Sequence, residues 1–175
     1  MRRILEKEFF ERPAEVVSKD LIGKYIVRRL SGKTVRLLIT ETEAYVGPHD
    51  LACHASKGRT QRTEGLFGEA GRFYVYFVYG MHYLLNIVTN EKDYPAGVLI
   101  RGAREITGPA RLTKFLTINK SFYGKRAIPK TGLWFEEGDG EEKFKIKKTP
   151  RIGVDFAGPI WSKKLLRFVL QIHER

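Results

Sequence analysis

Residues 24–46, KYIVRRLSGKTVRLLITETEAYV, predict the start of a β-sheet. Two runs rich in β-branched and other apolar residues, 24–30 and 33–46, are separated only by Ser31-Gly32. Such runs favour strands, and a short connection that contains glycine is typical of a β-hairpin. This stretch therefore predicts two adjacent antiparallel strands.

The segment before this hairpin predicts one helix. Pro13 suits the first helical position, and Gly23 suits the end of a helix that begins at Ala14. The apolar face expected for this helix consists of Val16, Val17, Leu21 and Ile22.

The segments after the hairpin predict mainly strands. Residues 72–79 and 82–89 flank Gly80-Met81 and predict a second hairpin, and 96–103 predicts another strand. Two further strands are expected over residues 144–154 and 165–172, after the acidic turn 136–142.

Two other segments complete this outline. Residues 47–71 are polar and rich in glycine, and a connection of that length predicts a functional loop. Thr107 is expected to cap a helix whose inner face consists of Leu112, Phe115 and Leu116, with Arg111 and Lys114 outside. Together these elements predict a single α+β domain over residues 1–175, with an antiparallel or mixed sheet and flanking helices.

The chain carries a strong positive charge. Its 175 residues include 32 Lys and Arg against 20 Asp and Glu, for a formal net charge of +12. Residues 101–175 alone carry 17 basic and 8 acidic side chains. This surplus predicts a polyanionic partner. A hydrophobic fraction of 42% is enough for a core and excludes a disordered chain.

Cysteine usage and hydropathy predict a soluble intracellular protein. Cys53 is the single cysteine, which excludes an internal disulfide and favours a reducing compartment. Charged residues interrupt the N-terminal stretch MRRILEKEFF, so it does not resemble a signal peptide, and no run is long enough to cross a membrane. We expect the cytoplasm or nucleoid of a prokaryote, or the nucleus of a eukaryote, and no membrane partner.

The residues LLITETEAY at 37–45 contain the first candidate for chemistry. In a regular strand, Leu37, Ile39, Glu41, Glu43 and Tyr45 share one face. Two carboxylates that continue an apolar face approach a dry environment, where a raised pKa makes a carboxylate a candidate general base. The alternative is that one or both carboxylates form ion pairs with nearby Arg or Lys at the rim of the sheet.

The residues RFYVYFVYGMHYLLN at 72–86 contain the second candidate. Tyr79 precedes Gly80 at the expected hairpin tip, so its ring should project outward. Proteins that handle unstacked bases use aromatic faces and apolar wedges. The alternative is ordinary packing, because aromatic residues favour strands in any case.

Two other groups of residues are candidates, one for a metal site and one for a phosphate-facing surface. His49, Cys53 and His54 lie close together but match no metal-binding spacing, so we expect no metal. The C-terminal basic residues are expected to form a phosphate-facing surface, although a solvated face is the alternative. They are Lys143, Lys145, Lys147, Lys148 and Arg151, with Lys163, Lys164 and Arg167 as a second cluster.

The chain resembles the alkyladenine (3-methyladenine) DNA glycosylase family over nearly its whole length. The resemblance rests on several separate motifs in the same order. They are ETEAYVGPHDLACH at 41–54, GRFYVYFVYGMHYLLNI at 71–87, AGVLIRGA at 96–103, TGPARL with INKSF at 107–122, and RIGVDFAG with LRF near the end.

The resemblance implies a base-excision-repair enzyme that acts on double-stranded DNA containing damaged purines. It implies a protruding hairpin that enters the minor groove, and excision of alkylated or deaminated purines without cofactor or metal. Extrusion of the damaged nucleotide has to precede the hydrolysis. The substrate class is 3-methyladenine, 7-methylguanine, hypoxanthine and ethenoadenine, the product is an abasic site, and a monomer is expected.

The resemblance also implies a role for individual residues. Glu43 corresponds to the general base that activates water, and Arg101 to the arginine that helps to hold that water. Tyr45 and Tyr76 correspond to the aromatics that sandwich the flipped base. The other pocket residues implied are His54 and Asn86, and the residue implied to intercalate is Tyr79.

A second interpretation is a non-catalytic basic module that binds DNA or RNA with the same fold. Binding alone does not need a buried carboxylate close to an anionic backbone, and that carboxylate would weaken it. Glu43 is therefore easier to explain in an enzyme than in a binding module.

Overall fold

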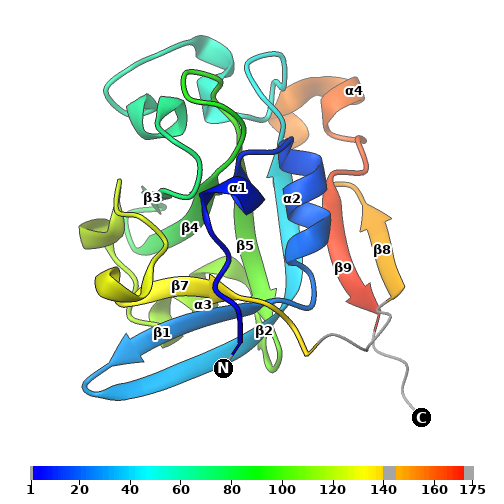
Figure 1. The fold of residues 1–175 in the computed structure, drawn as a ribbon. Coiled ribbons are helices and arrows are strands. Elements are labelled where there is room, and N and C mark those ends of the chain that lie inside the picture. Colours follow the sequence, from blue (N-terminus) through cyan, green and yellow to red (C-terminus); the bar gives the residue numbers. More distant parts are fainter. Residues whose placement is uncertain (1, 140–144, 172–175) are drawn as a thin grey trace.

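The computed structural model describes residues 2–139 and 145–171. Within these ranges nine strands form a sheet in which all recorded pairs are antiparallel, with the main order β3-β4-β5-β2-β1-β7 (Figure 1). The strands are β1 (Tyr25–Leu30), β2 (Lys33–Tyr45), β3 (Phe73–Val78), β4 (His82–Val88), β5 (Gly97–Ala103), β6 (Ile106–Thr107), β7 (Leu133–Glu136), β8 (Lys145–Thr149) and β9 (Arg167–Gln171). The predicted α+β fold with flanking helices is confirmed.

The helices are short. The α-helices are α1 (Lys7–Phe10), α2 (Ala14–Leu21), α3 (Pro109–Phe115) and α4 (Gly158–Trp161). The 3-10 helices are η1 (His54–Lys57), η2 (Glu64–Phe67), η3 (Lys120–Phe122), η4 (Pro129–Thr131) and η5 (Asp155–Ala157). Two of them, η1 and η2, lie in the predicted long loop.

Strand β2 lies in the centre of the sheet, and the predicted hairpin with β1 is confirmed. Its first half pairs with β1 through a two-residue turn, in which Ser31 has φ 47° and Gly32 has φ 79°. Positive φ at both positions is the geometry that favours a tight hairpin. Residues 41–43 pair with β5 on one edge of β2 and with β9 on the other. The C-terminal half of β2 is therefore held on both edges.

Helix α2 covers one face of this central region (Figure 1). The Ser18 hydroxyl donates to Thr42 Oγ1 at 2.9 Å, and the Thr42 hydroxyl donates to the Ser18 carbonyl at 2.8 Å. Because side chains alternate along a strand, Glu41 and Glu43 point to the face opposite α2. The packing of α2 on Thr42 thus decides which face carries the two carboxylates.

The alternation predicted from Leu37 to Tyr45 does not hold over its whole length. The pairing of β2 with β5 shifts register on both sides of Glu41. Leu38 and Ile39 are adjacent, yet both belong to the main hydrophobic core. A local irregularity of this kind reorients the side chains that follow it, so the apolar and the acidic parts of the strand are not one continuous face.

The two predicted helices are present, but each exposes a residue that was expected inside. Helix α2 buries Ala14, Val17, Ser18 and Leu21, a stripe at helical spacing that leaves Val16 outside. In α3 the buried positions are Leu112 and Thr113, and Phe115 is 54% exposed.

Two further local predictions are wrong. Thr107 does not cap α3, because it lies in β6 opposite Gly102 and the helix begins at Pro109. Residues 150–154 do not extend β8 but form a loop. Pro150 has no N–H to donate to a strand ladder, and Gly153 has a positive φ of 72°.

The main core contains aromatic contacts that join distant segments. The Phe135 ring lies 5.6 Å from that of Phe10 and 6.2 Å from that of Phe73, measured between ring centroids. Strand β7 is thereby packed against α1 and β3, although these segments are far apart in the sequence.

Replacement of Phe135 by alanine should lower the free energy of unfolding by roughly 3–5 kcal/mol, because it leaves a cavity in the core. Phe115→Ala is the matched control and should change stability by less than about 1 kcal/mol, because that ring is half exposed. Urea denaturation of both variants measures this difference. Equal losses would contradict the core described here.

Candidate active site

Glu43 is the most deeply buried carboxylate on the face of β2 opposite α2, and its side chain is 0% exposed. The Tyr45 hydroxyl donates to its Oε2 at 2.9 Å, and the Ile152 backbone N–H donates to its Oε1 at 2.7 Å. Arg101 Nε lies 3.6 Å from Oε1. Three different segments, β2, β5 and the loop 150–154, therefore meet at one carboxylate.

Glu41 has different surroundings, although it lies only two residues away. Its Oε1 accepts hydrogen bonds from Arg101 Nε at 2.9 Å and from Arg167 Nε at 2.6 Å. The ion-pair alternative holds for Glu41, and Arg101 also lies within ion-pair distance of Glu43. For Glu43 the polar contacts are an amide, a hydroxyl and a more distant cation.

Burial raises the pKa of the Glu43 carboxyl above its ordinary value, and desolvation is the largest cause. Arg101, the Ile152 amide, the Tyr45 hydroxyl and Arg151 all act against this shift, because they favour the charged form. Burial also raises the pKa of Tyr45 well above its usual range, so this hydroxyl stays protonated and remains a donor. The Glu43 carboxylate is therefore more basic than an exposed one, and these neighbouring groups still stabilise its ionised form.

The residues that contact Glu43 line a cleft of about 320 Å³. Tyr45, Arg101 and Ile152 form one part of its wall, and Tyr76 and His54 form another. A smaller inner cavity shares Tyr45, His54 and Tyr76 with this cleft, and Asn86 lines it as well. Tyr79 also lines the cleft, so the structure brings all seven predicted site residues to one place.

The aromatic wall of the cleft is held by ring contacts. The His54 and Tyr76 rings meet edge to face with centroids 4.5 Å apart, and the Tyr74 and Tyr76 centroids are 5.6 Å apart. Burial raises the pKa of Tyr76 to about 12, so its ring is uncharged at neutral pH. Tyr74 was not among the predicted residues.

The hydrogen bonds of Tyr74 fix the tautomer of His54. The Tyr74 hydroxyl donates to the Arg62 carbonyl at 3.2 Å, so its oxygen is left to accept from His54 Nδ1 at 3.1 Å. Burial lowers the pKa of His54, and nearby Arg62 lowers it further. His54 is then a neutral ring that carries its proton on Nδ1 and has Nε2 as an acceptor.

Asn86 and Tyr79 occupy opposite ends of the hairpin β3–β4. Asn86 is buried, and its Nδ2 donates to the Tyr74 carbonyl at 3.2 Å across the strand pair. Tyr79 is 89% exposed at the tip and has a positive φ of 53°. Its ring lines the same cleft as Arg101 and Tyr45. The outward projection predicted for Tyr79 is confirmed.

Some predicted basic residues do not face the solvent. Arg151 is fully buried against Asp50, and Arg167 is paired with Glu41. Lys148 forms an exposed pair with Glu15, and Lys143 lies outside the described residues. The prediction that Arg151 faces phosphate is therefore wrong, because its guanidinium is buried, whereas Arg167 remains partly exposed beside Glu41.

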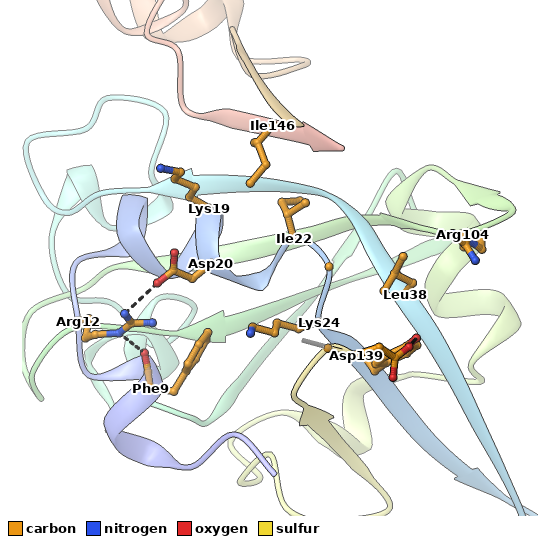
Figure 2. Close-up of a pocket in the computed structure, with 13 residues that line it drawn as sticks. Phe9, Arg12, Lys19, Asp20, Ile22, Lys24, Leu38, Arg104, Asp139 and Ile146 are labelled. Carbon is orange, nitrogen blue, oxygen red and sulfur yellow. Dashed lines mark hydrogen bonds and ion pairs between the residues drawn. The ribbon is translucent and has the colours of Figure 1, made fainter. Parts of the chain in front are cut away.

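Other features of the described residues do not add to the site. A separate cavity of about 620 Å³ lies away from the cleft and borders α2 and the start of β1 (Figure 2). Its Arg12 and Asp20 are paired with each other at 2.9 Å, and none of the predicted site residues lines it. In residues 2–139 and 145–171 no three His, Cys, Asp or Glu side chains are grouped to hold a metal ion. Over the same residues, no helix has the length and hydropathy of a membrane span.

The sequence of the chain was compared with those of known proteins. Residues 8–107 and 102–174 match the family model described as methylpurine-DNA glycosylase (MPG). Three similar proteins, all provisionally named 3-methyladenine DNA glycosylase, come from Methanocella arvoryzae, Legionella pneumophila (strain Paris) and Rickettsia peacockii. They are 40%, 41% and 44% identical to the chain.

These matches extend over most of both partners. They cover 89%, 98% and 95% of this chain, and 86%, 96% and 89% of the three relatives, in the same order. A buried carboxylate beside an aromatic cleft, a hairpin with an exposed tyrosine at its tip and these matches lead to the same conclusion. The chain belongs to the methylpurine-DNA glycosylase family and is a DNA glycosylase.

Proposed function

We propose that the chain binds duplex DNA, accepts a damaged purine nucleotide in the cleft and hydrolyses its N-glycosidic bond with water activated by Glu43. The observation that carries this proposal is the fully buried Glu43 carboxylate, whose three polar contacts all come from residues that line an aromatic cleft. The substrate class is a purine of the 3-methyladenine, 7-methylguanine, hypoxanthine and ethenoadenine type.

The residues divide the task by position. Tyr45 and Tyr76 offer ring faces on which an extruded base stacks, and stacking on aromatic side chains stabilises an unpaired base. The His54 Nε2 and the Asn86 amide add polar groups to the inner part of the pocket. Tyr79, exposed at the hairpin tip, occupies the space that the extruded base leaves in the duplex.

In the hydrolytic step, a water oxygen forms a bond to the sugar C1′ while the bond from C1′ to the purine nitrogen breaks. Glu43 takes the proton from the water, and its raised pKa makes it a better base than an exposed carboxylate. The recorded contacts of Arg101 with Glu41 and Glu43 both use Nε, so within the described residues its terminal nitrogens are free to hold the water. The electron pair of the broken bond goes to the purine nitrogen, which takes up a proton where the base was uncharged, and Glu43 then returns its proton to the solvent. The products are the free purine and an abasic site.

The cleft supports simple hydrolysis without cleavage of the strand. Strand cleavage through a covalent intermediate requires an amine nucleophile such as lysine. None of the described residues that line the cleft or its inner cavity is a lysine. A monofunctional glycosylase is therefore the form of the activity that we propose.

The decisive variant is Glu43→Gln, which keeps the volume of the side chain and removes its basicity. Single-turnover release of hypoxanthine from an inosine-containing duplex should fall by at least about 100-fold, because general base catalysis contributes that much. Binding of the same duplex should remain, as measured by fluorescence anisotropy. Retained activity in this variant would overturn the assignment of Glu43, and intact binding without release by the wild type on inosine and methylpurine duplexes would favour a binding module.

The pH dependence of the reaction tests the environment of Glu43. The rate should rise with pH as this carboxyl ionises, over a range above that of an exposed glutamate, because burial raises its pKa. Tyr45→Phe keeps the ring but removes a hydrogen bond that lowers this pKa, so the acidic limb should move to higher pH. The pH–rate profile under single-turnover conditions measures this shift. If the acidic limb does not move, the Tyr45 hydroxyl does not lower the pKa of Glu43.

Tyr79→Ser should slow excision from duplex DNA by about tenfold or more, because the extruded state loses its aromatic wedge. Val16→Ser removes an exposed apolar side chain from α2, on the opposite face of the sheet, and serves as the control. Single-turnover rates on a duplex and on the matching single strand show whether Tyr79 acts by inserting into the stacked duplex or by another contact with the substrate. A rate loss that is equal on both substrates would contradict insertion into the stacked duplex.

A further inference from the structure

A buried ion pair lies against the ring of Tyr45, whose hydroxyl donates to the proposed base. Arg151 and Asp50 are each 0% exposed, and the guanidinium meets the carboxylate with both terminal nitrogens, NH1 at 2.5 Å and NH2 at 2.9 Å. Asp50 also accepts from the backbone N–H of Val46 at 3.1 Å and of Ala52 at 3.0 Å. Its carboxylate thus has two hydrogen bonds from the arginine and two from the backbone that follows β2.

Arg151 joins the segments from which the cleft is built. Its NH1 donates to the Ala44 carbonyl at 2.9 Å, at the end of β2. Its guanidinium carbon lies 4.8 Å from the centre of the Tyr45 ring. An arginine cation over an aromatic face orients that ring through both charge and stacking. The base-stacking tyrosine therefore has its back face held by Arg151.

The residue that follows Arg151 provides the hydrogen bond to the base. The Ile152 N–H donates to Glu43 Oε1 at 2.7 Å, and the Ile152 side chain is half exposed in the wall of the cleft. Because residues 150–154 form a loop without strand pairing, the anchored Arg151 side chain is what fixes the amide next to it. Both the ring of Tyr45 and the amide of Ile152 are thus tied to one guanidinium.

General stability is a poor explanation for such a pair. Removal of two charges from water is costly, and apolar residues of similar volume often stabilise a protein as well as a buried ion pair does. The ion pair instead fixes the positions of the groups around it. Active sites need their groups held in place to well under about 1 Å.

We propose that the Asp50–Arg151 ion pair is the positioning element of this site, and that it sets the Tyr45 ring and the Ile152 amide in the relative orientation that the reaction needs. The inference rests on the proposed roles of Glu43 and Tyr45. Arg151 is a positioning residue, since its side chain is fully buried and acts through Asp50, the Ala44 carbonyl and the Tyr45 ring.

The ionisation of Glu43 offers a readout that a purely structural role would not change. The titratable and charged groups around its carboxylate are Tyr45 and Glu41 on β2, Tyr76 on β3, Arg101 on β5, Arg151 in the loop and Arg167 on β9, which is paired with Glu41. The Arg151 charge and the Ile152 amide both lower the pKa of Glu43. If the anchor is loosened, the carboxyl should hold its proton to higher pH.

The main test is Arg151→Lys, which keeps the charge but loses the two-pronged contact and the planar surface over Tyr45. Single-turnover release of hypoxanthine at saturating enzyme should fall by about 10- to 100-fold. The acidic limb of the pH profile should move to higher pH, while duplex affinity changes less than about threefold. Arg36→Lys, at the more exposed Arg36–Glu136 pair, is the control and should leave rate and profile unchanged.

Two further variants keep the proposal testable if Arg151→Lys does not fold. The double variant Asp50→Asn with Arg151→Met removes both charges at similar volume, so it should fold and still lose rate. An ester in place of the Arg151–Ile152 peptide bond keeps both side chains of the ion pair and replaces the Ile152 N–H with an oxygen that cannot donate, so it should shift the acidic limb. Thermal denaturation of each variant fixes an assay temperature at which it is folded.

The outcomes separate this inference from the proposed function. If Glu43→Gln is inactive but folded Arg151→Lys and the ester variant keep the wild-type rate and pH profile, the positioning role is wrong and the proposed function stands. If Glu43→Gln remains active, the assignment of the base fails first. Loss of rate in Arg151→Lys with a shifted acidic limb supports the inference.

Discussion

The site depends on one carboxylate, Glu43, that is fully buried and still stabilised in its ionised form. Burial of a carboxylate is costly unless hydrogen bonds or opposite charges compensate it. Around Glu43 the compensation is partial: a tyrosine hydroxyl, a backbone amide and an arginine at 3.6 Å. Glu41, by contrast, accepts hydrogen bonds from two arginines, Arg101 and Arg167. The difference between these two neighbouring residues separates a structural carboxylate from a proposed base.

The fold provides this environment through the arrangement of β2. Its C-terminal half is paired on both edges and covered on one face by α2, so the opposite face is rigid and set apart for the site. The register shift at Glu41 lets the strand change from core packing to the acidic face within a few residues. Strands β3 and β4 then bring the aromatic wall, and the loop after β8 closes the site with one amide.

Sequence patterns predicted the parts of this fold that local chemistry decides. The Ser31-Gly32 hairpin, the strand that carries Glu43 and the outward Tyr79 follow from periodicity and turn residues. The prediction that Arg151 faces phosphate failed because its partner, Asp50, lies 101 residues away in the sequence. Nothing in the basic run itself indicates that one of its arginines is buried in an ion pair. Strand β7 was missed because four residues carry little periodicity. The Ile152 amide could not be predicted, since every non-proline residue has one.

The most direct measurement of the central claim is the titration of Glu43 itself. With side-chain carboxyl carbons labelled with ¹³C, the resonance absent from Glu43→Gln identifies this group in the wild-type spectrum. Burial predicts a carboxyl that titrates above the range of the exposed glutamates. The proposed role as general base requires that it is ionised at neutral pH. A Glu43 carboxyl that is protonated at neutral pH, or that titrates with the exposed glutamates, would contradict these predictions.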